Sequence, residues 1–307
     1  MTKVFIDGSA GTTGLRIYER LGAREDITLL TLSDEKRKDP AARQEMLHTA
    51  DIAFLCLPDA AAIEAVALAE GSAVSIIDTS TAHRVNPDWV YGFPELTGKR
   101  DAVKAAKRIA NPGCHASGFV ALIAPLVERG LLNKDAALTC TSLTGYSGGG
   151  KQMIAQYEAP DRDPLLDAPR VYGLTQQHKH LKEMAAVCGI DNAPVFMPIV
   201  APYYCGMEVS IPLFMGDVNG TKADVVDCYK TYYTNGLVHF VETADEGGFL
   251  SAAAFAGRDD MQLTVTGNDE RVVLTARFDN LGKGASGAAI QNMNLLLGVD
   301  EGTGLNV

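Results

Sequence analysis

One cysteine stands where a protein chain can make a thiol reactive. Cys114 follows the turn-forming residues Pro112 and Gly113 and precedes a largely apolar stretch, 116–132, which we expect to be a helix that Pro125 kinks or breaks. A helix N-terminus stabilises negative charge, so a thiol placed there forms the nucleophilic thiolate more readily. We therefore predict that Cys114 forms a covalent intermediate with a substrate.

The other five cysteines stand where burial is expected. Two fall in expected strands, two in expected helices and one in a loop: Cys56 and Cys140, Cys188 and Cys228, and Cys205. Buried thiols behave as small apolar side chains. Six cysteines without a CxxC pair form neither a disulfide framework nor a zinc framework, so we predict no metal site.

Three glycines near the start of the chain form a second chemical signature. Gly8, Gly11 and Gly14 follow an expected strand and open an expected helix. Glycines in such a turn let backbone N–H groups approach a pyrophosphate at the helix N-terminus. The spacing is GxxGxxG, and a tight turn without a ligand is the alternative, but the position after a first strand favours a dinucleotide. The expected contacts are Gly8, Ser9, Ala10, Gly11, Thr12, Thr13 and Gly14.

A basic cluster bears on the choice of dinucleotide. Residues 36–38 are Lys-Arg-Lys and follow Ser33 near the end of the second expected strand. An acidic residue here favours a free ribose 2′-hydroxyl, whereas basic residues favour a 2′-phosphate. We predict NADP, with Ser33, Arg37 and Lys38 as contacts; a solvated charged loop is the alternative.

A nicotinamide cofactor and a thiolate are both required by one kind of reduction. A carboxylate is too weak an electrophile to accept hydride. A thiolate that attacks an acyl phosphate displaces phosphate and leaves a thioester, whose carbonyl accepts hydride. The two motifs together predict a reductase that converts an acyl phosphate into an aldehyde through a thioester on Cys114.

His178 and His180 are the candidates for proton transfer. A neutral imidazole near Cys114 can take the thiol proton and later protonate the aldehyde oxygen, because its pKa lies near working pH. Residues two apart point in different directions unless the chain is extended, so one ring should meet the thiol while the other orients or packs. We favour His178 over His180 as the acid/base. His115 is expected to be a surface histidine that points away from the nucleophile.

Two further segments can bind an anionic substrate. Residues 147–151 are Ser-Gly-Gly-Gly-Lys and follow an expected strand, so clustered N–H groups and a cation meet there. Ser147, Gly148 and Lys151 are the candidates, and a flexible glycine loop is the alternative. Arg84, in an irregular segment, is a candidate phosphate clamp because guanidinium pairs bidentately with phosphate; a structural salt bridge is its alternative.

Alternating strands and helices must position these motifs. The first half alternates expected strands with helices, and the second half is mostly strands: strands 3–7, 27–32, 52–57 and 73–78, helices 41–48 and 60–70, then strands 138–143, 195–200, 206–213, 262–267 and 271–278. The first pattern is typical of a parallel sheet with right-handed crossovers. The second indicates a mixed or antiparallel sheet. The expected last helix, 287–298, returns to cover the first domain. In the first helix we expect Leu15, Ile17, Tyr18 and Leu21 to be the apolar positions.

Length and composition limit the number of domains, the partners and the cellular location that we expect. The chain has 307 residues, 47% of them hydrophobic, which is enough for two packed domains. A formal charge of -11 argues against nucleic acid and anionic membranes as partners, but permits a small anionic substrate. The sequence shows neither a signal peptide nor an apolar run of membrane-spanning length, so we expect a cytoplasmic protein.

Five segments together match one enzyme family. They are residues 8–14, 57–58, 91–96, 111–114 and 279–287. On these motifs the chain resembles the shorter class of N-acetyl-γ-glutamyl-phosphate reductases. The resemblance implies a Rossmann-type dinucleotide-binding domain over 1–113, completed by 285–307. It also implies an α+β glyceraldehyde-phosphate-dehydrogenase-like domain over 114–284, and assembly as a homodimer or homotetramer.

The implied reaction is NADPH-dependent reduction of N-acetyl-glutamyl phosphate to the semialdehyde, in arginine biosynthesis, with Cys114 as nucleophile. The resemblance also assigns residues that spacing does not: Leu57, Pro58, Asn280 and Gly284 to the cofactor, and Glu183 to the substrate site. The longer class has Tyr where His115 stands, and Ala-Asp-Phe-Arg in place of residues 81–84.

Three rival functions remain open on sequence grounds. Another acyl-phosphate reductase, such as aspartate-semialdehyde dehydrogenase, shares the turn, the cysteine and the fold. A Cys/His hydrolase or acyltransferase would use the same thiol without NADPH. A regulatory protein would bind the nicotinamide cofactor without catalysis.

Overall fold

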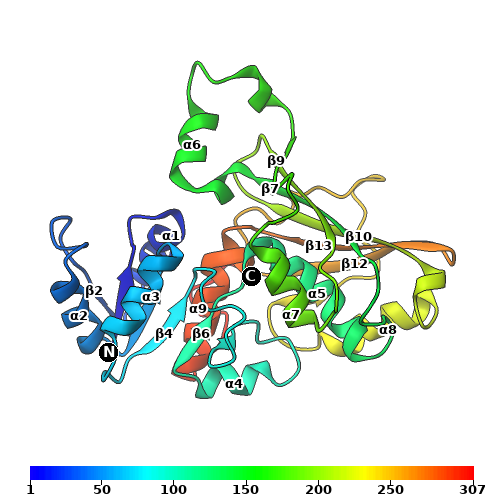
Figure 1. Cartoon of the computed structure of the whole chain (residues 1–307). Coiled ribbons are helices and arrows are strands. Elements are labelled where there is room, and N and C mark those ends of the chain that lie inside the picture. Colours follow the sequence, from blue (N-terminus) through cyan, green and yellow to red (C-terminus); the bar gives the residue numbers. More distant parts are fainter. The chain divides into compact units, whose positions relative to one another are not determined.

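The chain forms two compact units, each with its own sheet (Figure 1). The computed structural model describes residues 1–307. Met1–Pro112 and Ala285–Asn306 form unit 1, whereas Gly113–Gly284 and Val307 form unit 2. Among the helices, none combines the length and the hydropathy that a membrane span requires.

Unit 1 holds a parallel six-stranded sheet. The strands are β1 (Thr2–Asp7), β2 (Ile27–Leu30), β3 (Ile52–Leu55), β4 (Ser75–Asp78), β5 (Val90–Tyr91) and β6 (Arg108–Ala110). Their order is β2-β1-β3-β4-β6-β5, and every neighbouring pair is parallel. The chain steps from β1 to β2 on one side and then crosses to β3 on the other. The carboxyl end of β1 therefore lies at the switch point where open α/β sheets bind ligands.

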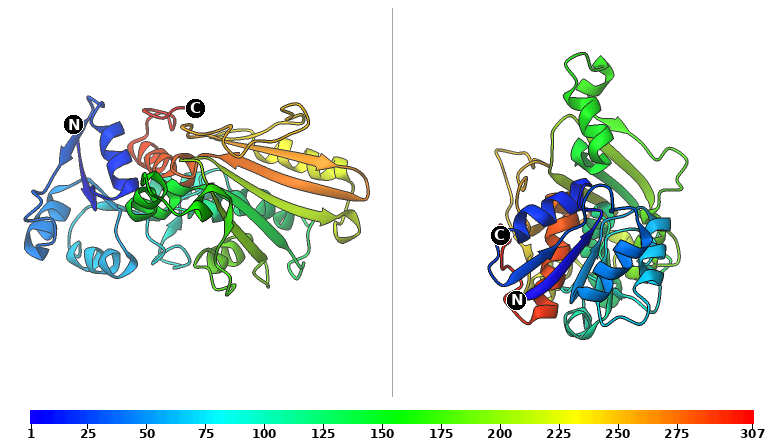
Figure 2. Two further views of the ribbon diagram at one scale, coloured as in Figure 1. Left: turned by 90° about the horizontal axis from the view of Figure 1, so that it is seen from above. Right: turned by 90° about the vertical axis from the view of Figure 1, so that its left-hand side faces the viewer.

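Helices cover both faces of this sheet because β1 alternates its buried side chains. Val4 and Ile6 pack with residues of α1 (Thr12–Leu21) and α9 (Gly287–Leu297). Phe5 faces the other way, toward α2 (Pro40–Thr49) and α3 (Asp59–Leu68). The right-hand view of Figure 2 shows the blue strands between these two helix layers. The last helix, α9, thus belongs to the core of unit 1, beside α4 (Lys99–Ala105).

Two of the four apolar positions named for the first helix lie outside its buried face. Leu15 and Tyr18 are exposed, whereas Ile17 and Leu21 are buried. The helix buries only the face that meets β1, and Gly14 occupies part of that face. Hydrophobicity alone does not report which side of a short helix meets the sheet.

Unit 2 holds a mixed seven-stranded sheet, as predicted. Its order is β11-β12-β13-β10-β7-β9-β8; the pairs β11–β12 and β7–β9 are parallel, and the other pairs are antiparallel. The strands are β7 (Thr139–Gly145), β8 (Arg170–Val171), β9 (Val195–Ala201), β10 (Met207–Phe214), β11 (Val238–Phe240), β12 (Met261–Gly267) and β13 (Arg271–Phe278). The helices are α5 (Cys114–Glu128), α6 (Gly150–Glu158), α7 (His180–Cys188) and α8 (Lys222–Tyr232).

Of the kink or break expected at Pro125, the break does not occur, because α5 runs through this residue to Glu128. Proline has no N–H, so the carbonyl of Ala121, four residues earlier, loses its helical donor. The Tyr233 hydroxyl donates to that carbonyl at 2.7 Å. A buried tyrosine thus replaces the missing helical bond, and the helix continues.

This substitute donor predicts a stability effect. Tyr233→Phe should lower the free energy of unfolding by about 1–3 kcal/mol, since the Ala121 carbonyl is then buried without a donor. Urea titration measures the change. Tyr232→Phe is the matched control, because its exposed hydroxyl donates to Glu128 at the surface. Equal losses in the two variants would show that Tyr233 has no special role.

Candidate functional site

Cys114 is the first residue of α5, as predicted, and Gly113 is its N-cap. The thiol is partly exposed, and it stands at the positive end of a helix of 15 residues. A Cβ built on Gly284 would lie 3.1 Å from the Cβ of Cys114, so the backbone of residue 284 passes directly beside the nucleophile. Any side chain there would crowd the thiol.

Glu183 fixes the backbone that leads into α5. Its buried carboxylate accepts the N–H of Gly113 at 2.8 Å, through Oε1. Glu183 lies in the first turn of α7, next to the predicted histidines. The family resemblance implies a substrate-site role for Glu183, which stays a prediction, and this contact shows that the carboxylate also holds the backbone beside Cys114.

Three histidine rings gather in unit 2. The centroids of His178 and His180 are 4.7 Å apart, and His115 lies 5.8 Å and 5.6 Å from them. The N–H of His180 donates to His178 Nδ1 at 3.2 Å, so a neutral His178 carries its proton on Nε2. Protonating Nδ1 would break this bond.

The expectation that His115 lies at the surface is wrong. The ring is buried, and both nitrogens have partners: Nδ1 lies 2.7 Å from Ser142 Oγ and Nε2 lies 2.6 Å from Tyr172 Oη. Burial, with the positive charges of His178 and Lys179, lowers the pKa of His115 to about 3. Sequence reasoning missed Ser142 and Tyr172. No local signal singles out Ser142, because β7 has the sequence Thr-Cys-Thr-Ser-Leu-Thr-Gly, with three other hydroxyl side chains.

The other cysteine thiols do not share these surroundings. None of the six forms a disulfide. Burial raises the pKa of Cys56 to about 12, and it also raises those of Cys140 and Cys188. Such thiols remain protonated at neutral pH.

The predicted anion-binding segment, residues 147–151, has one buried candidate and two exposed ones. Ser147 is buried in a single 3-10 turn after β7, and its Oγ accepts from Asn280 Nδ2 at 3.0 Å. Asn280 Oδ1 accepts the N–H of Gly206 at 2.9 Å, so both ends of this amide bind the protein. Gly148 is exposed on the same turn. Lys151 is exposed on α6, which stands away from the sheet of unit 2 in Figure 1.

In the glycine turn of unit 1, packing leaves no room for a side chain at Gly8 and Gly14, whereas Gly11 borders open space. Gly8 has φ +92, and a Cβ there would lie 2.2 Å from the Cys56 carbonyl oxygen. A Cβ on Gly14 would lie 2.4 Å from the Gly8 oxygen, so both positions demand glycine. Gly11, the N-cap of α1, has ordinary dihedrals and no contact closer than 3.4 Å. Thr12 Oγ1 is buried there without a partner. The start of α1 thus has space and donors for an anion.

The remaining predicted cofactor residues lie in loops of unit 1. Leu57 lies beside Gly8, and Pro58 is the N-cap of α3. The backbone after β2 turns at Ser33, whose carbonyl accepts the N–H of Arg37 at 3.0 Å. Ser33, Arg37 and Lys38 are all exposed. They are open to a ligand from solvent.

Arg84 binds backbone groups within unit 1. Its Nε donates to the Asn111 carbonyl at 3.0 Å, and Nη2 donates to the Thr79 carbonyl at 2.9 Å. These bonds hold two loop segments together. Next to it, His83 Nδ1 lies 2.6 Å from the buried Asp78 carboxylate.

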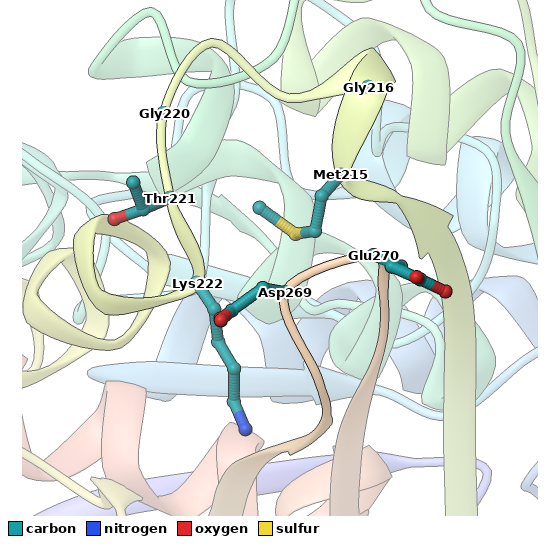
Figure 3. A pocket seen from close by; sticks show the side chains of 7 residues that line it. All are labelled: Met215, Gly216, Gly220, Thr221, Lys222, Asp269 and Glu270. Carbon is teal, nitrogen blue, oxygen red and sulfur yellow. The ribbon is translucent and has the colours of Figure 1, made fainter.

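A pocket of about 310 Å³ lies elsewhere in unit 2 (Figure 3). It is lined by Met215, Gly216, Gly220, Thr221, Lys222, Asp269 and Glu270. The Lys222 ammonium donates to the Gly267 carbonyl at 2.7 Å, and Thr221 caps α8. The lining contains none of the predicted nucleophile, base or cofactor residues.

The chain is similar to known proteins over its full length. Residues 3–106 match the semialdehyde dehydrogenase NAD binding domain, and residues 114–280 match the semialdehyde dehydrogenase dimerisation domain. N-acetyl-gamma-glutamyl-phosphate reductase 2 of Nostoc sp. is 43% identical, with 99% of each chain covered. N-acetyl-gamma-glutamyl-phosphate reductase of Brucella suis is 45% identical, over 96% of this chain and 99% of that one.

Solved structures show the same fold at much lower identity. Aspartate semialdehyde dehydrogenase II of Vibrio cholerae, complexed with ASA, superposes with a TM-score of 0.71 at 15% identity, covering 97% of this chain and 98% of that chain. Aspartate semialdehyde dehydrogenase of Francisella tularensis gives 0.72 at 14% identity, over 97% and 100%. The predicted fold class is confirmed.

Substitutions at two glycines of this turn should have different effects, one on stability and the other on cofactor binding. Gly8→Ala should destabilise unit 1, because its Cβ collides with the backbone of residue 56. Gly11→Ala should fold normally but weaken NADPH binding about tenfold or more, since its methyl group occupies the space open to a pyrophosphate. Thermal unfolding and NADPH fluorescence titration measure the two effects. Unchanged binding by Gly11→Ala would place the cofactor elsewhere.

Proposed function

The chain belongs to the semialdehyde dehydrogenase family, among its N-acetyl-γ-glutamyl-phosphate reductases, and we propose that it reduces N-acetyl-glutamyl 5-phosphate to N-acetyl-glutamate 5-semialdehyde with NADPH. This is a step of arginine biosynthesis. The observation that carries the proposal is the thiol of Cys114 at the N-terminus of α5, in a chain that aligns with these reductases from end to end. The aspartate-semialdehyde dehydrogenase alternative has no better support, because those structures are at most 18% identical.

The covalent step follows from the position of the thiol. The Cys114 sulfur attacks the acyl carbon, the bond from that carbon to the phosphate oxygen breaks, and inorganic phosphate leaves. A thioester on Cys114 remains. NADPH, when bound, supplies the hydride that converts the thioester carbonyl to the aldehyde and releases the thiolate.

The residues of unit 1 fit a dinucleotide. The open space at Gly11, the helix start without a side-chain cap and the unpartnered Thr12 hydroxyl suit a pyrophosphate. We propose the exposed Arg37 and Lys38, with Ser33, as contacts of the 2′-phosphate. Leu57 and Pro58 would line the same cofactor site. For Met1–Pro112 with Ala285–Asn306 we propose the cofactor-binding role.

We propose Gly113–Gly284 as the catalytic and assembly domain. His178 is the proposed acid/base and His180 the alternative, and Glu183 holds the start of α5. Because His178 Nδ1 accepts from the His180 amide, its proton chemistry must either use Nε2 or break this bond. A comparison of His178→Gln with His180→Gln across pH would show which ring titrates in turnover.

The substrate and assembly assignments depend on the same unit. Ser147, Gly148 and Lys151 remain candidates for the substrate's anionic groups, and Asn280 and Gly284 for the nicotinamide. Arg84 remains a candidate for phosphate, in addition to its backbone bonds. The match to a dimerisation domain supports a homodimer or homotetramer. We also propose that this biosynthetic enzyme acts in the cytoplasm.

The substrate assignment is tested in the phosphorolytic direction. With NADP and inorganic phosphate, kcat/KM for N-acetyl-glutamate semialdehyde should exceed that for aspartate semialdehyde by orders of magnitude, since the two differ in length and in the amide group. Comparable values would contradict the proposal. Acyl transfer or hydrolysis that is indifferent to NADPH would instead favour a Cys/His acyltransferase or hydrolase.

The nucleophile is tested by substitution. Cys114→Ser should lower turnover at least about a thousandfold, because the hydroxyl is a far weaker nucleophile than a thiolate. NADPH binding, measured by fluorescence, should remain unchanged. Cys205→Ser is the matched control at another partly exposed cysteine and should keep full activity. Full turnover by Cys114→Ser would refute the thioester route.

A further inference from the structure

We propose that Ser142 and His115 fix the direction of a buried hydrogen-bond chain, and that this chain makes the Tyr172 hydroxyl a donor toward the acyl group on Cys114. Ser142 Oγ lies 2.7 Å from His115 Nδ1, and His115 Nε2 lies 2.6 Å from Tyr172 Oη. That Cys114 carries an acyl group, and which group it is, rests on the proposed function. The direction of the chain rests on the hydrogen bonds themselves.

The serine sets the direction. Ser142 is completely buried, and its hydroxyl must donate to an acceptor. His115 Nδ1 is the one acceptor within reach of Ser142 Oγ. Nδ1 therefore carries no proton, so a neutral His115 has its proton on Nε2.

Tyr172 accepts the hydrogen bond that the Nε2 proton of His115 makes. His115 Nε2–H donates to Tyr172 Oη, which leaves the O–H of Tyr172 to donate elsewhere. Tyr172 is partly exposed, and its hydroxyl has no second protein partner. Its proton is thus available to a bound substrate.

Neither ring changes charge near neutral pH. Burial is the largest cause of the low His115 pKa, so the ring stays neutral and cannot reverse the chain by protonation. Burial also raises the pKa of Tyr172, and the charge of Cys114 raises it further. Tyr172 therefore keeps its proton, and its hydroxyl lies within electrostatic range of the nucleophile.

Strand register brings the chain together. Ser142 of β7 is paired with Pro198 of β9, and the Pro198 carbonyl accepts the N–H of Tyr172 at 3.0 Å, just after β8. The two hydroxyls thus flank β9, and His115 bridges them from the first turn of α5. The Tyr172 ring also packs against His178, with centroids 5.9 Å apart. The Tyr172 ring thus contacts both His115 of the nucleophile's helix and the proposed acid/base.

A donor at this place has a chemical use. The carbonyl oxygen of the acyl group gains negative charge when sulfur attacks and again when hydride adds. A hydroxyl already oriented by the protein stabilises that charge without rearrangement. Tyr172 is then a catalytic residue, whereas His115 and Ser142 are positioning residues. No proton leaves the chain in the process.

A double-mutant cycle tests the coupling. Tyr172→Phe should lower kcat about tenfold to a hundredfold, the effect of losing one hydrogen bond to a charged oxygen. Ser142→Ala should lower kcat severalfold, because His115 can then adopt the other tautomer. In the Tyr172→Phe background, Ser142→Ala should have almost no further effect on kcat. NADPH affinity should be unchanged in all three variants. Losses that multiply independently would overturn the proposal, since they would reflect packing alone.

A second measurement needs no substrate. Nitrogen-15 NMR of the histidine rings reports which ring nitrogen carries the proton, and His115→Gln identifies the His115 signals. We expect the Nε2–H tautomer in the parent protein and a mixture in Ser142→Ala. The Nδ1–H tautomer in the parent would overturn the inferred direction. Because this result does not depend on turnover, it stays informative even if the enzyme prefers a different acyl phosphate.

Discussion

The bond between the Gly113 amide and the Glu183 carboxylate is the constraint on which the reactive centre depends. It fixes where α5 begins, and therefore that Cys114 is the first helical residue. The carboxylate belongs to α7, the helix that also begins at His180. A single helix thus holds the backbone at the nucleophile and carries a candidate base. A shift of α7 would move both together, so their spacing is protected.

Steric pressure plays the corresponding role in unit 1. The end of β3 presses on the turn after β1 so closely that Gly8 and Gly14 have no room for a Cβ. Gly11 is under no such pressure. Three glycines that look equivalent in the sequence therefore have two different reasons to be glycine. Packing explains the outer two, and the proposed cofactor would explain the middle one.

The parts of this structure that depend on local pattern were predictable. Alternating apolar segments predicted the parallel sheet, and the Pro-Gly turn predicted the start of α5. What failed depends on partners distant in sequence. The helix survives Pro125 because Tyr233, more than a hundred residues later, supplies a donor. The buried His115 ring has partners for both nitrogens, one from β7 and one from the residue after β8, and no residue near position 115 indicates them.

The same reasoning explains why His115 is more than a buried ring. An imidazole has two nitrogens on opposite sides, so it can accept from one hydroxyl and donate to another. A chain of neutral groups also avoids the cost of burying a charge beside the nucleophile. The direction of hydrogen bonding, and not added charge, is what His115 contributes to the site.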